Sequence, residues 1–235
     1  MLTKSSIACI PGWGFKPSLL KDGLCLKESI LINLPDIKEL TLNRVAQNVS
    51  YLIPNNTTII GWSLGGLIGI MLAVYFPKKV KKLVLLSCSP RFTQKARWIG
   101  ISSVEVNKFI ELAENNIVNL FDYFLTLVNY PNRATCYRHL LLSHSLNCLE
   151  HRKVLLRYLR ILFKSDVRKI YKSITVPLFL VFGKQDPVVR LNLEKLYDLN
   201  PKAIMHAISG SGHLAFLTHK ESYYSQLIEF INYAE

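Results

Sequence analysis

The chain has 235 residues, of which 50% are hydrophobic and 19% are charged, with a formal net charge of +13. This length suits one large α/β domain or two small ones, and this apolar content excludes a disordered, fibrous or low-complexity chain. Apolar runs stay below the roughly 18 residues of a membrane span, and the N-terminus lacks a basic segment before a long apolar one, so we expect a cytoplasmic protein without a membrane-bound part.

The first part of the chain alternates between strand and helix patterns. Short runs rich in β-branched residues indicate buried strands, and apolar residues at helical spacing indicate the helices between them. In chain order we expect a strand at 6–10, a glycine-rich turn at Pro11–Gly14, a strand at 29–35, a helix within 37–53, a strand at 57–61, a helix at 64–76 and a strand at 80–89.

The middle of the chain, from about Arg91 to Ile174, has a different pattern. It contains helix-like runs at 104–128 and 151–174 and no clear strand. The alternation then resumes with a strand at 176–183, a helix at 193–199, a strand at 202–209 and a helix at 223–234. This order predicts an α/β fold in which a mostly parallel sheet carries helices on both faces. We divide the chain into a core at 1–89 and 175–235 and a helical cap at 90–174.

The stretch "GWSLG", Gly61 to Gly65, satisfies the pattern G-x-S-x-G between a predicted strand and a predicted helix. In that context the serine lies on a strained turn, and the flanking glycines are needed because another segment of the backbone passes close to them. The turn would place Ser63 at a helix N-terminus, where free backbone N–H groups stabilise negative charge. We therefore interpret Ser63 as a candidate nucleophile.

A serine nucleophile needs a base and an acid, and suitable residues follow in the chain order Ser, Asp, His. Asp186 comes just after a predicted strand, and His213 lies in a small-residue loop after the next one. His206 and His219 are less well placed, inside a strand and at a helix start. For the two N–H donors of an oxyanion hole we choose Leu64 and Trp13.

Each of these features also has an ordinary structural explanation. The glycine motif alone occurs by chance at helix starts, Asp186 alone could cap a turn, and His213 could be a plain loop histidine. Their order and their positions at strand ends favour the catalytic interpretation. The five cysteines lack the paired spacing of a zinc or redox site, so we expect reduced thiols, no metal and no cofactor.

Three stretches carry a closer resemblance: "GWSLGG" at 61–66, "GWG" at 12–14 and "SCSPRFTQKARWIGI" at 87–101. With them the chain resembles the α/β-hydrolases over its whole length, and most of all the pimeloyl-[acyl-carrier protein] methyl ester esterases of biotin synthesis. The resemblance implies an α/β-hydrolase fold and a serine carboxylesterase that releases methanol from the carrier-bound ester.

When the motif residues of the family are matched to this chain position by position, the resemblance implies a role for each site residue. Ser63 would be the nucleophile, His213 the base and then the acid, and Asp186 the residue that orients the imidazole. Trp13 and Leu64 would bind the oxyanion. The substrate would contact Trp13, Ser63, Leu64, His213 and the run "FLTLV", which comprises Phe124, Leu125, Thr126, Leu127 and Val128.

The positive charge is concentrated in one segment, because residues 131–172 hold ten lysines and arginines against two acids. Acyl carriers are small acidic proteins, and a basic cap would attract them. We expect the docking face at Arg133, Arg138, Arg152, Arg157 and Arg160, although a solvated basic helix surface would have the same composition.

Three other functions remain open at this point. The same residues would serve an esterase or thioesterase for other small acyl substrates, and a hydrolase fold can also be a binding protein without activity. The basic segment raises nucleic-acid binding as a third possibility, but no nucleic-acid module is recognisable, so we expect no nucleic-acid partner. We expect the acyl carrier protein as partner of a monomeric enzyme.

Overall fold

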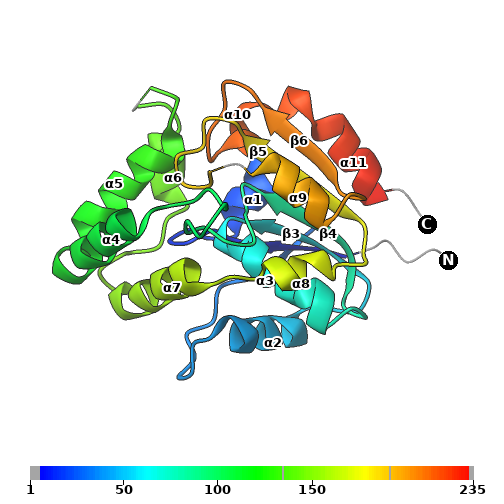
Figure 1. The fold of residues 1–235 in the computed structure, drawn as a ribbon, viewed down its shortest axis with the longest axis horizontal. Helices are drawn as coiled ribbons and strands as arrows, with labels where there is room; N and C mark the ends of the chain where they lie inside the picture. The colour runs from blue at the N-terminus through cyan, green and yellow to red at the C-terminus, as the bar shows by residue number, and fades with distance from the viewer. Residues whose placement is uncertain (1–5, 134, 191, 233–235) are drawn as a thin grey trace.

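The computed structural model describes residues 6–133, 135–190 and 192–232 (Figure 1). A six-stranded sheet, parallel throughout, has the strand order β2-β1-β3-β4-β5-β6. Its strands are β1 (Ile7–Ile10), β2 (Ile30–Leu31), β3 (Thr57–Trp62), β4 (Val80–Leu86), β5 (Leu178–Gly183) and β6 (Ile204–Ile208). The predicted fold class is therefore confirmed.

One set of helices alternates with the strands of the sheet, and a second set lies between β4 and β5. The first set comprises α1 (Ser18–Gly23), α2 (Leu42–Leu52), α3 (Leu64–Tyr75), α9 (Leu193–Leu199), α10 (Ala215–Thr218), the 3₁₀ helix η1 (Lys220–Ser222) and α11 (Tyr224–Asn232). The second comprises α4 (Ser103–Asn115), α5 (Ile117–Asn129), α6 (Arg138–Ser143), α7 (Arg152–Lys164) and α8 (Arg168–Lys172). Figure 1 shows α4 to α7 gathered at one side, away from both ends of the chain.

Two neighbouring residues of β4 show that both faces of the sheet are covered. The side chain of Lys82 reaches α11, where its amine donates to the carbonyl of Phe230. The next residue, Leu83, lies on the opposite face against Gly69 of α3. Side chains alternate between the two faces of a strand, so α11 and α3 pack on opposite faces. Strands β3 and β5 are accordingly buried along their whole length, as expected of central parallel strands.

Both long helical runs of the middle region are interrupted, which corrects the two predicted continuous runs. Asn116 has an extended backbone, ends α4, and caps α5 by accepting a hydrogen bond from Asn119 N at 3.0 Å. Ser165 is extended in the same way after α7. The predicted strand at 29–35 was also too long, because only Ile30–Leu31 pair with β1 at the edge of the sheet.

The side chain of Asp166 connects the loop after β4 to the start of α8 through hydrogen bonds with arginines of both segments. Its carboxylate accepts two hydrogen bonds from Arg168, at 2.7 and 2.8 Å, and one from Arg91 at 3.0 Å. The hydrogen bonds from Arg168 lower the pKa of Asp166 from 3.8 to about 2. Because the folded pKa lies below the unfolded one, the carboxylate stabilises the fold above pH 3.8, and this contribution disappears as the pH falls through 2.

We expect Asp166→Asn to remove this pH dependence. Urea unfolding at several pH values measures it: between about pH 5 and pH 2 the wild type would lose about 1–2 kcal/mol more unfolding free energy than the variant. Asp122→Asn is the matched control, because Asp122 pairs with Arg138 at an exposed site and such pairs contribute little. Equal pH profiles for wild type and Asp166→Asn would contradict the expectation.

Candidate active site

The candidate nucleophile lies on a strained turn between β3 and α3. Ser63 has φ +54° and ψ −114°, a backbone conformation that residues other than glycine rarely adopt. A Cβ on Gly65 would lie 2.2 Å from the carbonyl oxygen of Ile10, and one on Gly61 would lie 2.5 Å from that of Gly65. The two glycines are therefore needed because backbone passes directly beside them.

The contact between Gly65 and Ile10 also joins the elbow to the turn after β1. It holds the start of α3 against the end of β1, so the turn containing Trp13 follows directly beside the elbow. Leu64 is the first residue of α3, and the N–H of a first helical residue has no acceptor within its helix. Trp13 and Ser63 line the same cavity, and the oxyanion role of Leu64 and Trp13 stays a prediction.

Asp186 and His213 form a buried hydrogen-bonded pair beyond the ends of β5 and β6. His213 Nδ1 lies 2.7 Å from Asp186 Oδ2, and the two side chains are 0% and 2% exposed. The other carboxylate oxygen accepts from the backbone N–H groups of Val188 and Val189, at 2.8 and 2.9 Å. These donors fix the orientation of the Asp186 side chain toward the imidazole.

The pairing decides which nitrogen of His213 is available. A carboxylate only accepts hydrogen bonds, so Nδ1 carries the proton and a neutral ring presents Nε2 as an acceptor. Nε2 is buried and has no hydrogen-bond partner among the described residues. Such a nitrogen is suited to take a proton from a hydroxyl that approaches it.

Trp62 contacts His213, and the sequence patterns did not predict this contact. Its indole N–H donates to the backbone carbonyl of His213 at 3.2 Å, and its ring centroid lies 5.3 Å from that of His213. The histidine loop also packs against the end of α5, since a Cβ on Gly212 would overlap the carbonyl of Tyr130. These contacts join residues far apart in the chain, so local sequence patterns carry no signal for them.

A cavity of about 330 Å³ extends from Ser63 into the helices between β4 and β5. Its wall is mainly apolar and aromatic, and Trp13 contributes to it beside the serine. The Trp13 indole N–H donates to the carbonyl of Leu155 in α7 at 2.8 Å, and its ring packs edge-on against Phe124 at 5.1 Å. The remaining apolar wall comes from Ile101, Phe109, Leu112, Leu120, Tyr123, Leu127, Leu159, Leu162, Phe163, Pro187 and Val188.

Only part of the run "FLTLV" faces this cavity, because the run is helical and not extended. Phe124 and Leu127, three residues apart on α5, line the cavity. Leu125 and Thr126 line a separate hollow of about 100 Å³, and Val128 is buried without lining either. Of the five residues predicted to contact the substrate, the two on one helix face therefore line this cavity.

We expect Leu127→Trp to shorten the acyl chain that the cavity accepts. The larger ring would occupy cavity volume, so kcat/KM for a methyl ester with a seven-carbon acyl chain should fall about tenfold or more, while that for an acetate ester should change little. The comparison requires steady-state kinetics on both esters. Thr126→Trp is the control on the exposed face of α5, and an equal loss in both variants would exclude this cavity as the acyl site.

Charged side chains gather where the cavity reaches the surface. Glu105 and Lys108 of α4 and Arg190 of the loop after β5 belong to its wall. Arg190 forms an ion pair with Glu105 and donates to the carbonyl of Gly100 at 2.9 Å. The hydrogen bond from Ser102 lowers the pKa of Glu105, which keeps the carboxylate charged. The cavity therefore has an apolar interior and a charged mouth.

Most of the arginines predicted to dock a carrier have partners within the chain. Arg138 pairs with Asp122 and Arg160 with Glu114, both between helices of the middle region. Arg152 donates to the carbonyl of Glu114. Arg157 pairs with Asp36 at 3.0 Å and also donates to the carbonyls of Ile37 and Lys38. For Arg133, only its backbone carbonyl takes part in a described hydrogen bond.

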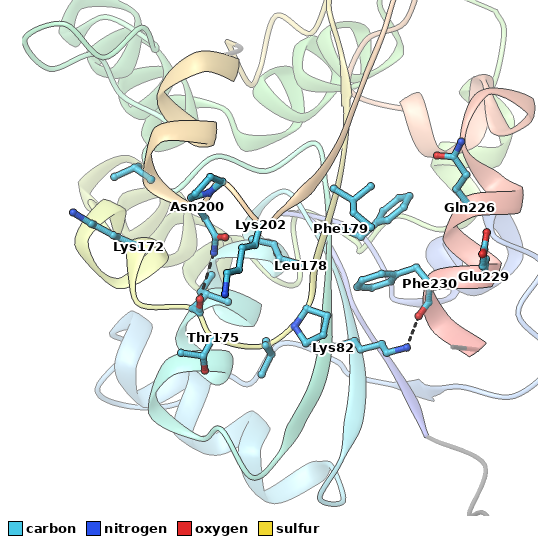
Figure 2. A pocket seen from close by; sticks show the side chains of 16 residues that line it. Lys82, Lys172, Thr175, Leu178, Phe179, Asn200, Lys202, Gln226, Glu229 and Phe230 are labelled. Atoms are coloured by element: carbon cyan, nitrogen blue, oxygen red, sulfur yellow. Dashed lines mark hydrogen bonds between the residues drawn. The ribbon is translucent and has the colours of Figure 1, made fainter. Parts of the chain in front are cut away.

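A cavity of about 900 Å³, larger than the one at Ser63, lies at the other end of the sheet (Figure 2). It is lined by the first residues of β5 and β6, Leu178 and Ile204, whereas Asp186 and His213 follow the last residues of those strands. In Figure 2 the amine of Lys82 points to the C-terminal end of α11, where it donates to the Phe230 carbonyl. This lysine therefore interacts with the helix end.

The other candidate groups lie outside the serine site. His206 is on β6 and stacks on Phe179, and burial lowers its pKa. His219 Nδ1 lies 2.8 Å from the Thr218 hydroxyl. The cysteines are free thiols. Among residues 6–133, 135–190 and 192–232, no three His, Cys, Asp or Glu side chains gather as metal ligands would, and no helix has the length and hydropathy of a membrane span.

The fold and the turn at Ser63 define the class of protein. Residues 41–220 match the family described as alpha/beta hydrolase fold, and the chain belongs to this family. The structure is also similar to that of an esterase from Exiguobacterium antarcticum, with a TM-score of 0.81 and 19% sequence identity. The match covers 97% of this chain and 92% of that protein. At that identity the likeness concerns the fold.

Relatives with higher identity share one name. The chain is 28% identical over 230 residues to the pimeloyl-[acyl-carrier protein] methyl ester esterase of Hamiltonella defensa, covering 94% of this chain and 80% of that protein. It is 26% identical over 240 residues to the protein of the same name from Photobacterium profundum, covering 97% and 94%. The predicted resemblance to this group of esterases is confirmed.

Proposed function

We propose that the protein is a serine carboxylesterase that hydrolyses the methyl ester of pimeloyl-acyl carrier protein. The observations that carry this proposal are the buried His213–Asp186 pair with its unpartnered Nε2 and the position of Ser63 in the wall of an apolar cavity. The names of the relatives over most of the chain support the choice of substrate.

The proposed mechanism uses the groups of this site in two half-reactions. His213 Nε2 takes the Ser63 hydroxyl proton while the serine oxygen attacks the ester carbonyl, and the N–H groups of Leu64 and Trp13 stabilise the oxyanion. The imidazolium, stabilised by Asp186, gives its proton to the departing methoxide, so methanol leaves and an acyl-serine remains. Water then attacks with His213 again as base, which frees the carboxylate and restores Ser63.

The shape of the cavity supports an acyl chain with a polar far end. The methyl ester would lie at Ser63, the methylene chain along Phe124 and Leu127, and the carrier-bound end at the charged mouth. We propose that residues 90–174 form the cap over this site, that the enzyme acts in the cytoplasm as a monomer, and that it needs neither metal nor cofactor.

Two alternatives differ from this function in measurable ways. A thioesterase built on the same residues would release the carrier thiol and leave the methyl ester intact. A binding protein without activity would leave Ser63 unmodified by an organophosphonate, whereas an activated serine next to a free imidazole nitrogen reacts with it.

Genetic rescue tests the proposed function in a cell. A bacterial strain that requires biotin because it lacks its own methyl ester esterase should grow without biotin when it expresses the wild-type chain, and should not when it expresses Ser63→Ala at the same level. Rescue by both versions, or by neither, would contradict the proposal.

A further inference from the structure

Trp62, the residue directly before the candidate nucleophile, takes no part in the proposed mechanism. It is the last residue of β3 and is buried, with 1% of its surface exposed. Its backbone pairs with Leu86 of β4 within the sheet, which fixes the point from which the side chain extends. Among the described residues that line the cavity at Ser63, Trp62 is not found, so its ring does not form the wall around an acyl chain.

The indole of Trp62 lies against the turn after β1. A Cβ on Gly12 would lie 2.8 Å from Cε3 of the indole, and the next two atoms, both at 3.1 Å, also belong to Trp62. The ring therefore occupies the space that a side chain at position 12 would need. Phe15 packs on the same indole, with ring centroids 5.0 Å apart. Gly12 directly precedes Trp13, whose N–H is one of the two proposed oxyanion donors.

The same indole also contacts the loop that carries the proposed base. Its N–H donates to the carbonyl of His213 at 3.2 Å, and the two ring centroids are 5.3 Å apart with an angle of 44° between the planes. Phe216, three residues further along, packs on the indole at 5.4 Å. One rigid ring, attached next to Ser63, thus contacts both the turn of Trp13 and the loop of His213.

The loop before His213 depends on such contacts for its position. It contains Gly210, with φ +76°, and Gly212, and glycine allows more backbone conformations than other residues. Asp186 accepts a hydrogen bond at Nδ1 and so orients the imidazole. The hydrogen bond from Trp62 holds the backbone of the same residue. The side chain and the main chain of His213 are therefore each bonded to a buried partner.

We propose that Trp62 is a positioning residue of the reaction, whose indole sets the distance of the His213 imidazole from the Ser63 hydroxyl. The inference rests on the proposed function, because it concerns the same serine site. A proton passes from the serine oxygen to Nε2 only when the two atoms come within hydrogen-bond reach. A displacement of about 1 Å in such a site can lower the rate about a hundredfold.

Trp62→Phe tests this role because it removes the N–H donor and part of the ring. We expect kcat for a small methyl ester to fall about 10- to 100-fold, while KM changes less than about threefold, since the residue does not line the cavity. Trp98→Phe is the matched control: Trp98 is also buried and donates its indole N–H to the Arg91 carbonyl at 2.9 Å. Its kcat should stay within about threefold of the wild type. A wild-type kcat in folded Trp62→Phe would overturn the inference.

Gly12→Ala tests the spacing without removing the indole. The added methyl group would overlap Trp62 and displace the ring, so this change alone should lower kcat about tenfold. In the Trp62→Phe background the smaller ring leaves room for the methyl group, and the same change should cost less than about threefold. Losses that simply multiply would contradict the inference, because the effect of Gly12→Ala would then not pass through the indole.

Thermal unfolding followed by circular dichroism verifies that each variant is folded. If Trp62→Phe does not fold, Trp62→Met takes its place in both comparisons, because the flexible methionine side chain fills irregular space and also lacks the donor. The expected loss of kcat and the expected coupling to Gly12→Ala are the same for both variants.

Labelling by a p-nitrophenyl phosphonate separates this inference from the proposed function. The Ser63 oxygen bonds to phosphorus, His213 takes the hydroxyl proton and p-nitrophenolate leaves, so no particular ester is needed. The rate constant should fall about 10- to 100-fold in Trp62→Phe. This loss in a protein that leaves the carrier-bound ester intact would support the positioning role and contradict only the esterase function. Equal labelling rates would overturn the positioning role alone, and a wild type that is not labelled would overturn both.

Discussion

Replacing Ser63 with alanine is expected to lower kcat for ester hydrolysis by about 10⁵- to 10⁶-fold, the cost of removing the nucleophile of a serine triad. The remaining rate would come from the oxyanion donors and from substrate binding. Hydrolysis of a small methyl ester measures this loss, and labelling by an organophosphonate should disappear with it.

Ser87→Ala is the matched control for this prediction. Ser87 is also a buried serine at the end of a central strand, and its hydroxyl has no hydrogen-bond partner among the described residues. Its replacement should change kcat less than about threefold, in the range usual for residues outside the site. A Ser63→Ala variant that kept more than a hundredth of the wild-type rate, in a folded protein, would exclude Ser63 as the nucleophile.

The second large effect concerns stability. A methyl group on residue 65 would lie 2.2 Å from the Ile10 carbonyl oxygen, and both groups belong to the backbone of packed elements that cannot move apart cheaply. We expect Gly65→Ala to reduce the free energy of unfolding by about 3 kcal/mol or more. Urea denaturation of the purified variant measures the change.

Gly69→Ala provides the comparison within the same helix. There the added methyl group would meet side chains and no backbone: Leu83 Cδ1, the end of a flexible side chain, at 2.8 Å, and Ile59 Cγ2 at 3.4 Å. Alanine also favours a helix by about 1 kcal/mol over glycine, which offsets part of the crowding. If the two variants were equally stable, the close packing of the elbow on β1 would not be the reason for the glycine at position 65.

Local patterns predicted the elements whose signal is local. The apolar runs around β3 and β5 located these strands within two residues, and the helix predicted at 193–199 coincides with α9. The split at Asn116 was missed because a single polar residue among helix formers is ambiguous until its backbone conformation is known. The short edge strand β2 depends on pairing with β1, which its own residues do not specify.

The features of the site also divide into those that local sequence patterns predict and those that depend on contacts between distant residues. Ser63, with its flanking glycines, is recognisable from five consecutive residues, and the order of Asp186 and His213 adds to it. The hydrogen bond from Trp62 to His213 crosses 151 positions, so no nearby pattern predicts it. The face of α5 toward the cavity also depends on how the helix packs, which is why only Phe124 and Leu127 remain as lining residues of the predicted run.

Charge counting located a basic segment and could not say which charges are free. Arg138 and Arg160 pair with acids of other helices, whereas Lys172 of α8 has no ion pair among the described residues. Lys195, outside the segment, joins the same surface through the fold. The availability of a charge thus follows from tertiary contacts and not from composition.

Product analysis on the carrier-bound ester tests the proposed activity most directly. Pimeloyl-acyl carrier protein methyl ester is incubated with the wild-type protein, methanol is quantified by gas chromatography, and the carrier is examined by intact-protein mass spectrometry. We expect one methanol for each carrier that loses its methyl group, with the thioester intact and with no product from Ser63→Ala. Release of the free carrier thiol, or a carrier that keeps its methyl ester, would contradict the assignment.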